Sequence, residues 1–327
     1  MSLPCGVTDE IDKILKGFLW TQTDKSNGKA KVAWKDICFP KDQGGLGIKP
    51  LREWNDVLMI KNLWRSFTQK DSLWGKWVNL IKLKGGSIWD VNLAYNDSWG
   101  WKCLLELRER IHPHFFEENG SFLWITNDDR KVDYSTSQVW SDLRINKSKV
   151  AWSHVIWFKG FEPKHAFILW LAALNRLNTQ DRISKWMPNK NLSCCFCGMI
   201  HDSINHLFFR CDYSDAIWKK FKSMILFRGL PNHFEGIVNA LAIYPFSNNI
   251  WNVVNRIVFA ACVYFIWNER NGRLFKLKKK AANELYETIY DHVRFKLVTM
   301  KIRRSAAVLK VAQLWNLVYS DKGYSLA

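Results

Sequence analysis

The feature that most constrains this chain is a cluster of cysteines with one histidine near its middle. The spacing is Cys194-x2-Cys197-x8-His206-x4-Cys211. Zinc in structural sites takes four sulfur or nitrogen ligands at the corners of a tetrahedron. A Cys-x2-Cys turn places two thiolates on one side of such an ion, and His-x4-Cys returns two ligands from the other. Because all four positions are then filled by protein, we expect one structural Zn²⁺ with no open position for a catalytic water.

Two neighbouring side chains compete for places in this ligand set. Cys195 leaves only one residue between itself and Cys197, which is tight for the usual turn, and choosing His201 would break the His-x4-Cys pair. The alternative without metal is a set of buried free thiols. A hairpin this small cannot bury a core of its own, so we expect bound metal to supply its folding energy. The spacing resembles retroviral zinc knuckles, but its central spacer is longer, so the same mode of base binding is not implied.

Cysteine usage and the apolar stretches indicate an intracellular protein. Eight cysteines in 327 residues are too few for a disulfide scaffold, and their crowding near Cys194 favours metal ligation in a reducing compartment. The stretch Met1–Asp12 lacks the pattern of a secretory signal. The most apolar stretch, Ile257–Trp267, is shorter than the roughly 20 residues that cross a bilayer. We therefore expect it to be a buried helix, with no membrane partner, and the chain to act in the nucleus or cytoplasm.

The chain is strongly basic, with a net charge of +18 at pH 7. Between Arg270 and Lys310 there are 12 Lys or Arg and 3 Asp or Glu, so this stretch carries 12 − 3 = +9. Such an excess favours polyanionic partners, because cations that neutralise phosphates release condensed counterions. The alternative is a solvated helix face without a ligand. The residues expected to contact phosphates are Lys278, Lys279, Lys280, Arg303 and Arg304.

Hydrophobic periodicity predicts helices along most of the chain. The expected helices are 7–20, 54–67, 135–143, 163–174, 214–227, 251–270 and 281–318, the last one amphipathic and basic. Two short β-like runs, Ser121–Thr126 and Lys131–Tyr134, flank Asn127-Asp128-Asp129, which predicts a hairpin turn. The glycines after Pro40 predict a tight turn with close backbone approach, and no Lys-Ser or Lys-Thr follows them to make a nucleotide-binding loop.

A Trp-rich stretch from 72 to 110 contains Trp74, Trp77, Trp89, Trp99 and Trp101. Such side chains can stack on nucleic-acid bases. Tryptophans more commonly belong to the core, and that is the interpretation we favour here.

An ordered series of sequence segments extends along the chain. Around the cysteine cluster these are Phe161–Trp170, Leu177–Arg182, His206–Cys211 and Ala216–Trp218. Before it they are Phe18-Leu19-Trp20, Val32-Ala33-Trp34, Pro40–Gly47 and Trp54–Trp64, and after it Ile266–Asn271 with Arg273 and Phe275. Together these segments resemble the C-terminal, post-polymerase region of plant LINE-type (non-LTR) retrotransposon reverse transcriptases, including their zinc-binding domain. The resemblance covers nearly the whole chain.

The resemblance and the residues together predict a mainly α-helical protein with a small β-hairpin element and one zinc knuckle. Four segments are expected: 1–70 helical, 71–118 Trp-rich, 119–225 zinc-binding, and 226–327 basic and helical. The family's polymerase aspartates lie before such a region, and Asp128-Asp129 lacks their apolar context and sits in an expected turn. We therefore expect no enzyme activity, and polymerisation in trans is disfavoured.

The expected function is to bind RNA or DNA as the template-handling or target-docking part of a retroelement enzyme. Other retroelement proteins are further candidate partners, and no small-molecule substrate is expected. The alternative is a protein-interaction or scaffold module, or the product of a decayed element without selected activity. Salt-dependent binding would favour the first interpretation over the second.

Overall fold

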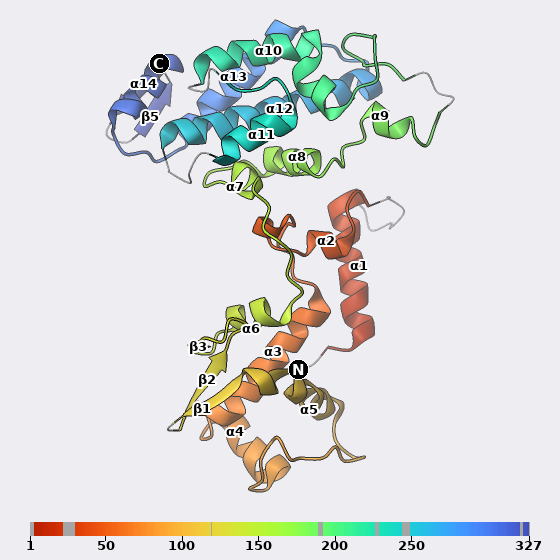
Figure 1. Ribbon diagram of the computed structural model, residues 1–327, viewed down its shortest axis with the longest axis vertical. Helices are drawn as coiled ribbons and strands as arrows, with labels where there is room; N and C mark the ends of the chain where they lie inside the picture. Colours follow the sequence, from red (N-terminus) through yellow and green to blue (C-terminus); the bar gives the residue numbers. More distant parts are fainter. Residues whose placement is uncertain are drawn as a thin grey trace. The chain divides into compact units, whose positions relative to one another are not determined.

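The computed structural model describes residues 3–21, 30–118, 120–188, 192–225, 229–243, 249–320 and 323–326. The chain divides into two compact units, Met1–Ser148 and Lys149–Ala327. Both are mainly helical, and each has one small antiparallel sheet, as Figure 1 shows. The expected fold class is confirmed. Of the four expected segments, the first two lie in the first unit, the third is shared by both units, and the fourth lies in the second.

The first unit is organised around the helix α3 (Leu51–Thr68). Ile60, Leu63 and Trp64 recur on one face of this helix and are buried, as their spacing predicts. They pack with α5 and α6 over the small sheet. The other elements of this unit are α1 (Cys5–Thr21), α2 (Trp34–Ile37), α4 (Leu73–Trp77), the π-helical η2 (Val78–Leu83), α5 (Trp99–Ile111) and α6 (Thr136–Leu143).

The predicted hairpin is present, with one more strand than expected. β2 (Ser121–Ile125) pairs with β3 (Lys131–Val132), and β1 (Phe115–Glu118) adds to the other side of β2. The turn contains Asp129 at φ 57°, and the Thr126 N–H donates to the Arg130 carbonyl at 2.9 Å. Both aspartates of the turn are exposed, and Asp128 pairs with Arg130. The pair Asp128-Asp129 is therefore a surface loop.

The glycines after Pro40 form the tight turn that the sequence predicts. A Cβ atom at Gly45 would lie 1.9 Å from the carbonyl oxygen of Phe39, so only glycine allows this approach. Gly44 and Gly47 adopt φ values of 92° and 76°, a region that glycine enters at little cost.

The tryptophans of the first unit divide between core and surface. Trp101 is 3% exposed and belongs to the core, and Trp74 and Trp89 pack against it or its neighbours. Trp77 and Trp99 are 39% and 48% exposed. The core assignment therefore holds for three of the five and is wrong for these two, because they lie at the rim of a pocket between α4 and α5.

The second unit is built around α12 (Ile250–Lys276), which α8, α10, α11 and α13 contact (Figure 1). By length and composition this helix could span a bilayer, but 78% of its most apolar window is buried within the protein. The buried helix expected at 257–267 is thus confirmed and is longer than expected. The remaining elements are α7 (Ser153–Ile156), α8 (Pro163–Ala173), α9 (Gln180–Ile183), the π-helical η4 (His206–Arg210), α10 (Asp212–Met224), α11 (Phe234–Ile243), α13 (Ala282–Val298), α14 (Ala306–Leu314), β4 (Leu317–Ser320) and β5 (Gly323–Leu326).

The C-terminal stretch differs from the single helix expected over 281–318. It forms α13, a non-helical connector over 299–305, α14 and then the hairpin β4–β5. Ser305 ends the connector by capping α14, since its hydroxyl accepts the N–H of Val308 at 3.3 Å. The expected helix 214–227 ends at Met224, and Phe227 lies outside the described residues.

Candidate zinc centre

The four predicted ligands come together in the second unit. The ligand atoms of Cys194, Cys197, His206 and Cys211 all lie within 4.8 Å of one another. Cys194 Sγ is 4.0 Å from Cys211 Sγ, and Cys197 Sγ is 3.4 Å from His206 Nε2. In a tetrahedral site with Zn–S bonds of about 2.3 Å, neighbouring ligand atoms lie roughly 3.5–3.8 Å apart. The spacing therefore fits a single tetrahedral zinc ion.

The first ligand pair is held by a tight turn. The N–H of Gly198 donates to the carbonyl of Cys194 at 2.7 Å, and Gly198 adopts φ 72°. The turn directs the backbone N–H groups of Phe196 and Cys197 at the Cys194 sulfur. These donors stabilise a thiolate there before any cation binds.

The second ligand pair lies at the two ends of η4. The carbonyl of His206 accepts the N–H of Cys211 at 2.8 Å, which closes the turn. Cys211 is also the residue directly before α10, and the N–H of Tyr213 in the first turn of that helix donates to the Cys211 sulfur. Between the ligands, Phe208 and Phe209 are fully buried. The ring of Phe209 stacks on that of Phe259 in α12, with the ring centroids 5.9 Å apart. The core of the unit thus fixes this pair.

The donor set favours negative charge at one sulfur. The hydrogen bond with the Cys211 thiol is the main cause that lowers the pKa of Cys194 to about 5. The pKa of the Cys211 thiol is raised, mainly because it shares its proton with Cys194 and secondly because it is buried. The buried arrangement therefore favours a thiolate at Cys194 facing a thiol at Cys211. A divalent cation replaces the shared proton when it binds, because ligating cysteines must be deprotonated. The residues fit zinc, which would supply structural cross-linking here.

The two competing side chains do not join the cluster. Cys195 points to the C-terminal part of α12, where its Sγ lies 3.9 Å from the carbonyl oxygen of Arg270. Burial raises the pKa of the Cys195 thiol to about 12, so it stays protonated at neutral pH. His201 is exposed and is not part of the group of ligand atoms.

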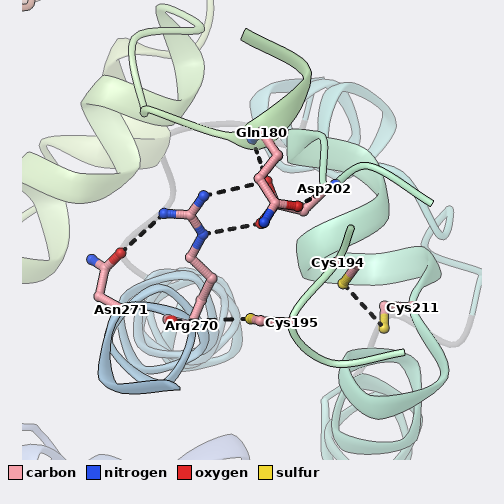
Figure 2. A network of polar contacts seen from close by, with 7 residues as sticks. All are labelled: Gln180, Cys194, Cys195, Asp202, Cys211, Arg270 and Asn271. Carbon is pink, nitrogen blue, oxygen red and sulfur yellow. Dashed lines mark hydrogen bonds and ion pairs between the residues drawn. The ribbon is translucent and has the colours of Figure 1, made fainter. Parts of the chain in front are cut away.

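A buried ion pair anchors the segment 194–205, which we call the zinc-binding loop, to α12, as Figure 2 shows. Arg270 Nε donates to Asp202 Oδ2 at 3.0 Å, and both side chains are at most 2% exposed. Asp202 also accepts the backbone N–H of Gln180, and its own N–H donates to Gln180 Oε1 at 3.4 Å. Because every charged atom of the carboxylate has a donor, the cost of burying it is offset. The pair connects the loop, α9 and α12.

A second arginine of α12 covers the outer side of the loop. Arg273 donates to the carbonyl of Cys195 at 3.3 Å and to Glu269 Oε1 at 2.8 Å. Its guanidinium also lies over the rings of Phe196 and Tyr213, at 4.8 and 4.5 Å. The segment Ile266–Asn271 with Arg273, which carried part of the family resemblance, therefore contacts the zinc-binding loop directly.

These supporting residues were not predicted from the sequence. The available signal was a set of charged residues, Glu269, Arg270 and Arg273, at the end of an apolar helix, together with Asp202 beside the cysteine motif. The expected self-contained hairpin also differs from the structure, in which the ligands are embedded in the core of a larger unit. Metal need not supply all of its folding energy.

A second group of metal-capable side chains lies in the same unit. Glu162 at the start of α8 accepts a hydrogen bond from His292 Nε2 of α13 at 2.7 Å, and His165 Nδ1 lies 3.8 Å from the same oxygen. His165 is buried, and burial lowers its pKa to about 4. We call these three residues the Glu–His cluster.

The predicted phosphate contacts lie on the connectors between helices, and for Arg303 and Arg304 this differs from the helix expected over 281–318. Leu277 adopts φ 53° and ends α12, so Lys278–Lys280 form the connector to α13. Arg303 and Arg304 lie in the connector before α14. Lys278, Lys279, Arg303 and Arg304 are exposed, whereas Lys280 is half-buried, with its ammonium 3.2 Å from Thr288 Oγ1.

Comparison with known proteins supports the zinc assignment. Residues 134–218 match the family described as zinc-binding in reverse transcriptase. A putative ribonuclease H protein of Arabidopsis thaliana is 35% identical over 140 residues, which cover 42% of this chain and 21% of the relative. An uncharacterized mitochondrial protein of the same plant is 26% identical over 103 residues, 31% of this chain and 67% of the relative. No solved structure matches.

The matched region includes all four ligands of the cluster. It also includes η4 and the start of α10, which position His206 and Cys211. The chain spans about a fifth of the length of the first relative. Residues 134–218 therefore form a region of the reverse-transcriptase zinc-binding type, in a chain that shares further sequence with two plant proteins.

Proposed function

We propose that this chain is the zinc-stabilised, non-catalytic, nucleic-acid-binding part of a LINE-type reverse transcriptase, where it docks RNA template or target DNA. The observation that carries the proposal is the Cys194, Cys197, His206, Cys211 tetrad, held at zinc-compatible distances inside a reverse-transcriptase zinc-binding region. The tetrad fills all coordination positions, so the ion would organise a binding surface and would not perform chemistry.

The charge distribution supports nucleic acid as the partner. The zinc-containing unit includes the stretch 270–310 with its excess of +9. Lys278, Lys279, Arg303 and Arg304 are exposed, and among the described residues none of them forms a salt bridge. Cations without acidic partners gain most from neutralising phosphates.

A non-catalytic role agrees with the distribution of carboxylates. Phosphodiester chemistry with two metal ions requires several carboxylates around one site. In the described part of the chain, the groups of side chains close enough to share an ion include a single carboxylate, Glu162. We therefore propose for this chain no activity of the kind that the name of the Arabidopsis ribonuclease H relative describes.

The experiment that tests the proposal is salt-titrated binding of the full zinc-loaded chain to labelled oligonucleotides, namely single-stranded RNA, single-stranded DNA and duplex DNA. We expect log Kd to depend linearly on log salt, with a slope of about 0.7 for each phosphate contacted on a single strand. Absence of binding at low salt to all three would overturn the proposal.

The second candidate function is a protein-interaction or scaffold module, including a remnant without selected activity. The exposed tryptophans Trp77 and Trp99, beside a pocket in the first unit, favour it. Association with another retroelement protein that is insensitive to salt, together with no oligonucleotide binding, would support this candidate.

A further inference from the structure

The second unit contains a groove of about 880 Å³ that the zinc centre does not use. Its walls are the turn at Lys159-Gly160, the start of α12, the end of α13 and the connector into α14. Gly160 adopts φ 91°, and a Cβ atom there would lie 3.7 Å from Met300 Cε, so this turn packs directly on the connector wall. The groove is therefore formed by segments far apart in the sequence.

The charges of the groove are all of one sign. Its lining contains four cations, Lys159, Lys296, Lys301 and Arg303, and no carboxylate. Among the described residues none of these four cations is engaged in a salt bridge, whereas Lys219 and Arg273 of the same unit pair with acids. Lys159, Lys301 and Arg303 thus lack the compensation that other basic side chains of the unit have, whereas Lys296 also interacts electrostatically with the Glu162 carboxylate.

Two helix N-termini add to this positive potential. α12 begins at Ile250 and α14 at Ala306, both at the groove, and neither helix has an acidic residue in its first turn. A helix N-terminus carries a partial positive charge, which acidic residues commonly compensate. Here the neutral side chains of Asn249 and Ser305 cap the two helix ends, so no carboxylate compensates their partial positive charge.

The floor of the groove is apolar. Ile250, Val253 and Val308 line it and are at most 9% exposed, and Met300 lies beside them. A site for small inorganic anions would not need such a floor. Cations bordering an apolar strip suit a ligand with charged and apolar parts along its length, which describes a single nucleic-acid strand with its bases unpaired. In a duplex, the faces of the bases are stacked and hidden.

We propose that this groove is the main binding site for a single RNA or DNA strand, with Lys159, Lys296, Lys301 and Arg303 neutralising consecutive phosphates. The inference rests on the proposed function and gives it a location. It also distinguishes the groove cations from the basic cluster at Lys278, although the sequence alone gives no reason to prefer either one. The groove lies at the start of α12, and Lys278 follows its end. A helix of 27 residues is about 40 Å long, so these clusters cannot contact the same few nucleotides.

The test compares three double variants of the full zinc-loaded chain with the parent. Lys301→Gln with Arg303→Gln removes two groove cations. Lys278→Gln with Lys279→Gln removes the rival pair, and Lys16→Gln with Arg52→Gln is a charge-matched control in the first unit, where both residues are exposed. Binding of a labelled single strand of about eight nucleotides is measured against salt by fluorescence anisotropy, with zinc content and melting temperature checked for each variant.

We expect the groove variant to bind about tenfold or more weakly at low salt, with its salt slope reduced by about 1.4, corresponding to two lost phosphate contacts. The Lys16/Arg52 control should change little, and the Lys278/Lys279 variant should lose less than the groove variant. Acetylation of Lys159 and Lys301, followed by mass spectrometry, should be suppressed by the oligonucleotide.

Other outcomes overturn the inference in distinguishable ways. An equal or larger loss of oligonucleotide affinity in the Lys278/Lys279 variant would show that the groove is not the main binding site, but it would not contradict the proposed function. Duplex that binds as tightly as single strand, with equal loss in the groove variant, excludes selection for a single strand. Tighter binding of poly-glutamate than of the oligonucleotide indicates an acidic protein partner. No binding of any oligonucleotide by the parent contradicts the proposed function itself.

Discussion

In the described part of the second unit, two groups of metal-capable side chains occur, and they differ in what satisfies their polar atoms. In the zinc tetrad, backbone N–H groups of Phe196, Cys197 and Tyr213 point at sulfurs that only a cation or a shared proton can bring together. Thiols are weak hydrogen-bonding groups, so the tetrad has little reason to gather unless it holds an ion.

The Glu–His cluster already satisfies itself. Glu162 accepts a hydrogen bond from His292 at 2.7 Å, shorter than the separation of two ligands around one zinc ion. Lys296 and Lys164 lie close enough to disfavour a further positive charge at His165. The comparison teaches that proximity of ligand types is not sufficient for a metal site. The donors must also lack better partners among themselves.

The largest expected effect follows from removing a zinc ligand. Cys197→Ser or Cys211→Ser should abolish stoichiometric zinc and destabilise the second unit by more than about 3 kcal/mol, since structural zinc contributes roughly 10–16 kcal/mol in small zinc-finger peptides. Metal analysis and thermal melting measure both. Glu162→Gln is the matched control from the other cluster and should keep its zinc. Equal zinc loss in the control would erase the distinction between the clusters.

Removing the anchor of the zinc-binding loop should have the next largest effect. Asp202→Ala leaves the Arg270 guanidinium buried without its partner and should cost about 3–5 kcal/mol in urea unfolding, with zinc still bound at excess metal. The double variant Asp202→Leu with Arg270→Met should recover much of that loss, because apolar residues of similar volume replace buried pairs well. A loss below about 1 kcal/mol for the single variant would show that the pair is not an anchor.

The Glu–His cluster should make the second unit sensitive to acid. Burial holds the pKa of His165 near 4 in the folded state against 6.5 ordinarily. The unfolded chain therefore binds a proton more readily, and stability falls as pH decreases from 6.5 toward 4, by up to about 3 kcal/mol. The groups facing His165 are Glu162, whose charge opposes this loss, and His292, Lys296 and Lys164, which add to it. His165→Asn should flatten the dependence of unfolding free energy on pH, and an unchanged slope would contradict this assignment.

The smallest expected effect concerns the cysteine outside the tetrad. Cys195→Ser should retain about one zinc per chain and lose less than about 1 kcal/mol, because its thiol makes only a weak contact with the Arg270 carbonyl. Competition with a chelating dye measures zinc affinity in this variant. A loss of zinc comparable to that of Cys197→Ser would mean that Cys195 enters the coordination shell.

The part of the fold that depends on local periodicity could be predicted from the sequence. The apolar spacing of α3 places its buried face correctly, the apolar composition of α12 predicts a buried helix, and turn chemistry predicts the hairpin around Asp129. The break at 299–305 within the expected helix 281–318 could not be predicted in this way, because it does not interrupt the charge pattern, and α12 continues to Lys276, beyond its expected end at Arg270. Tertiary packing decides those ends.

The candidate site shows the same division. Ligand spacing predicts the tetrad and favours Cys194 over Cys195, because the chemistry is local to two short turns. The pair Asp202–Arg270 joins residues 68 apart, and the basic groove joins segments from Lys159 to Val308. Neither has a periodic signature, so only the folded chain reveals them.

The most direct test of the zinc assignment is X-ray absorption at the zinc edge on the purified full chain, combined with metal quantification. The structure predicts one zinc per chain with three sulfur ligands at about 2.3 Å and one imidazole nitrogen at about 2.0 Å. A spectrum dominated by oxygen and nitrogen ligands, or freshly purified protein that contains no zinc, would contradict it.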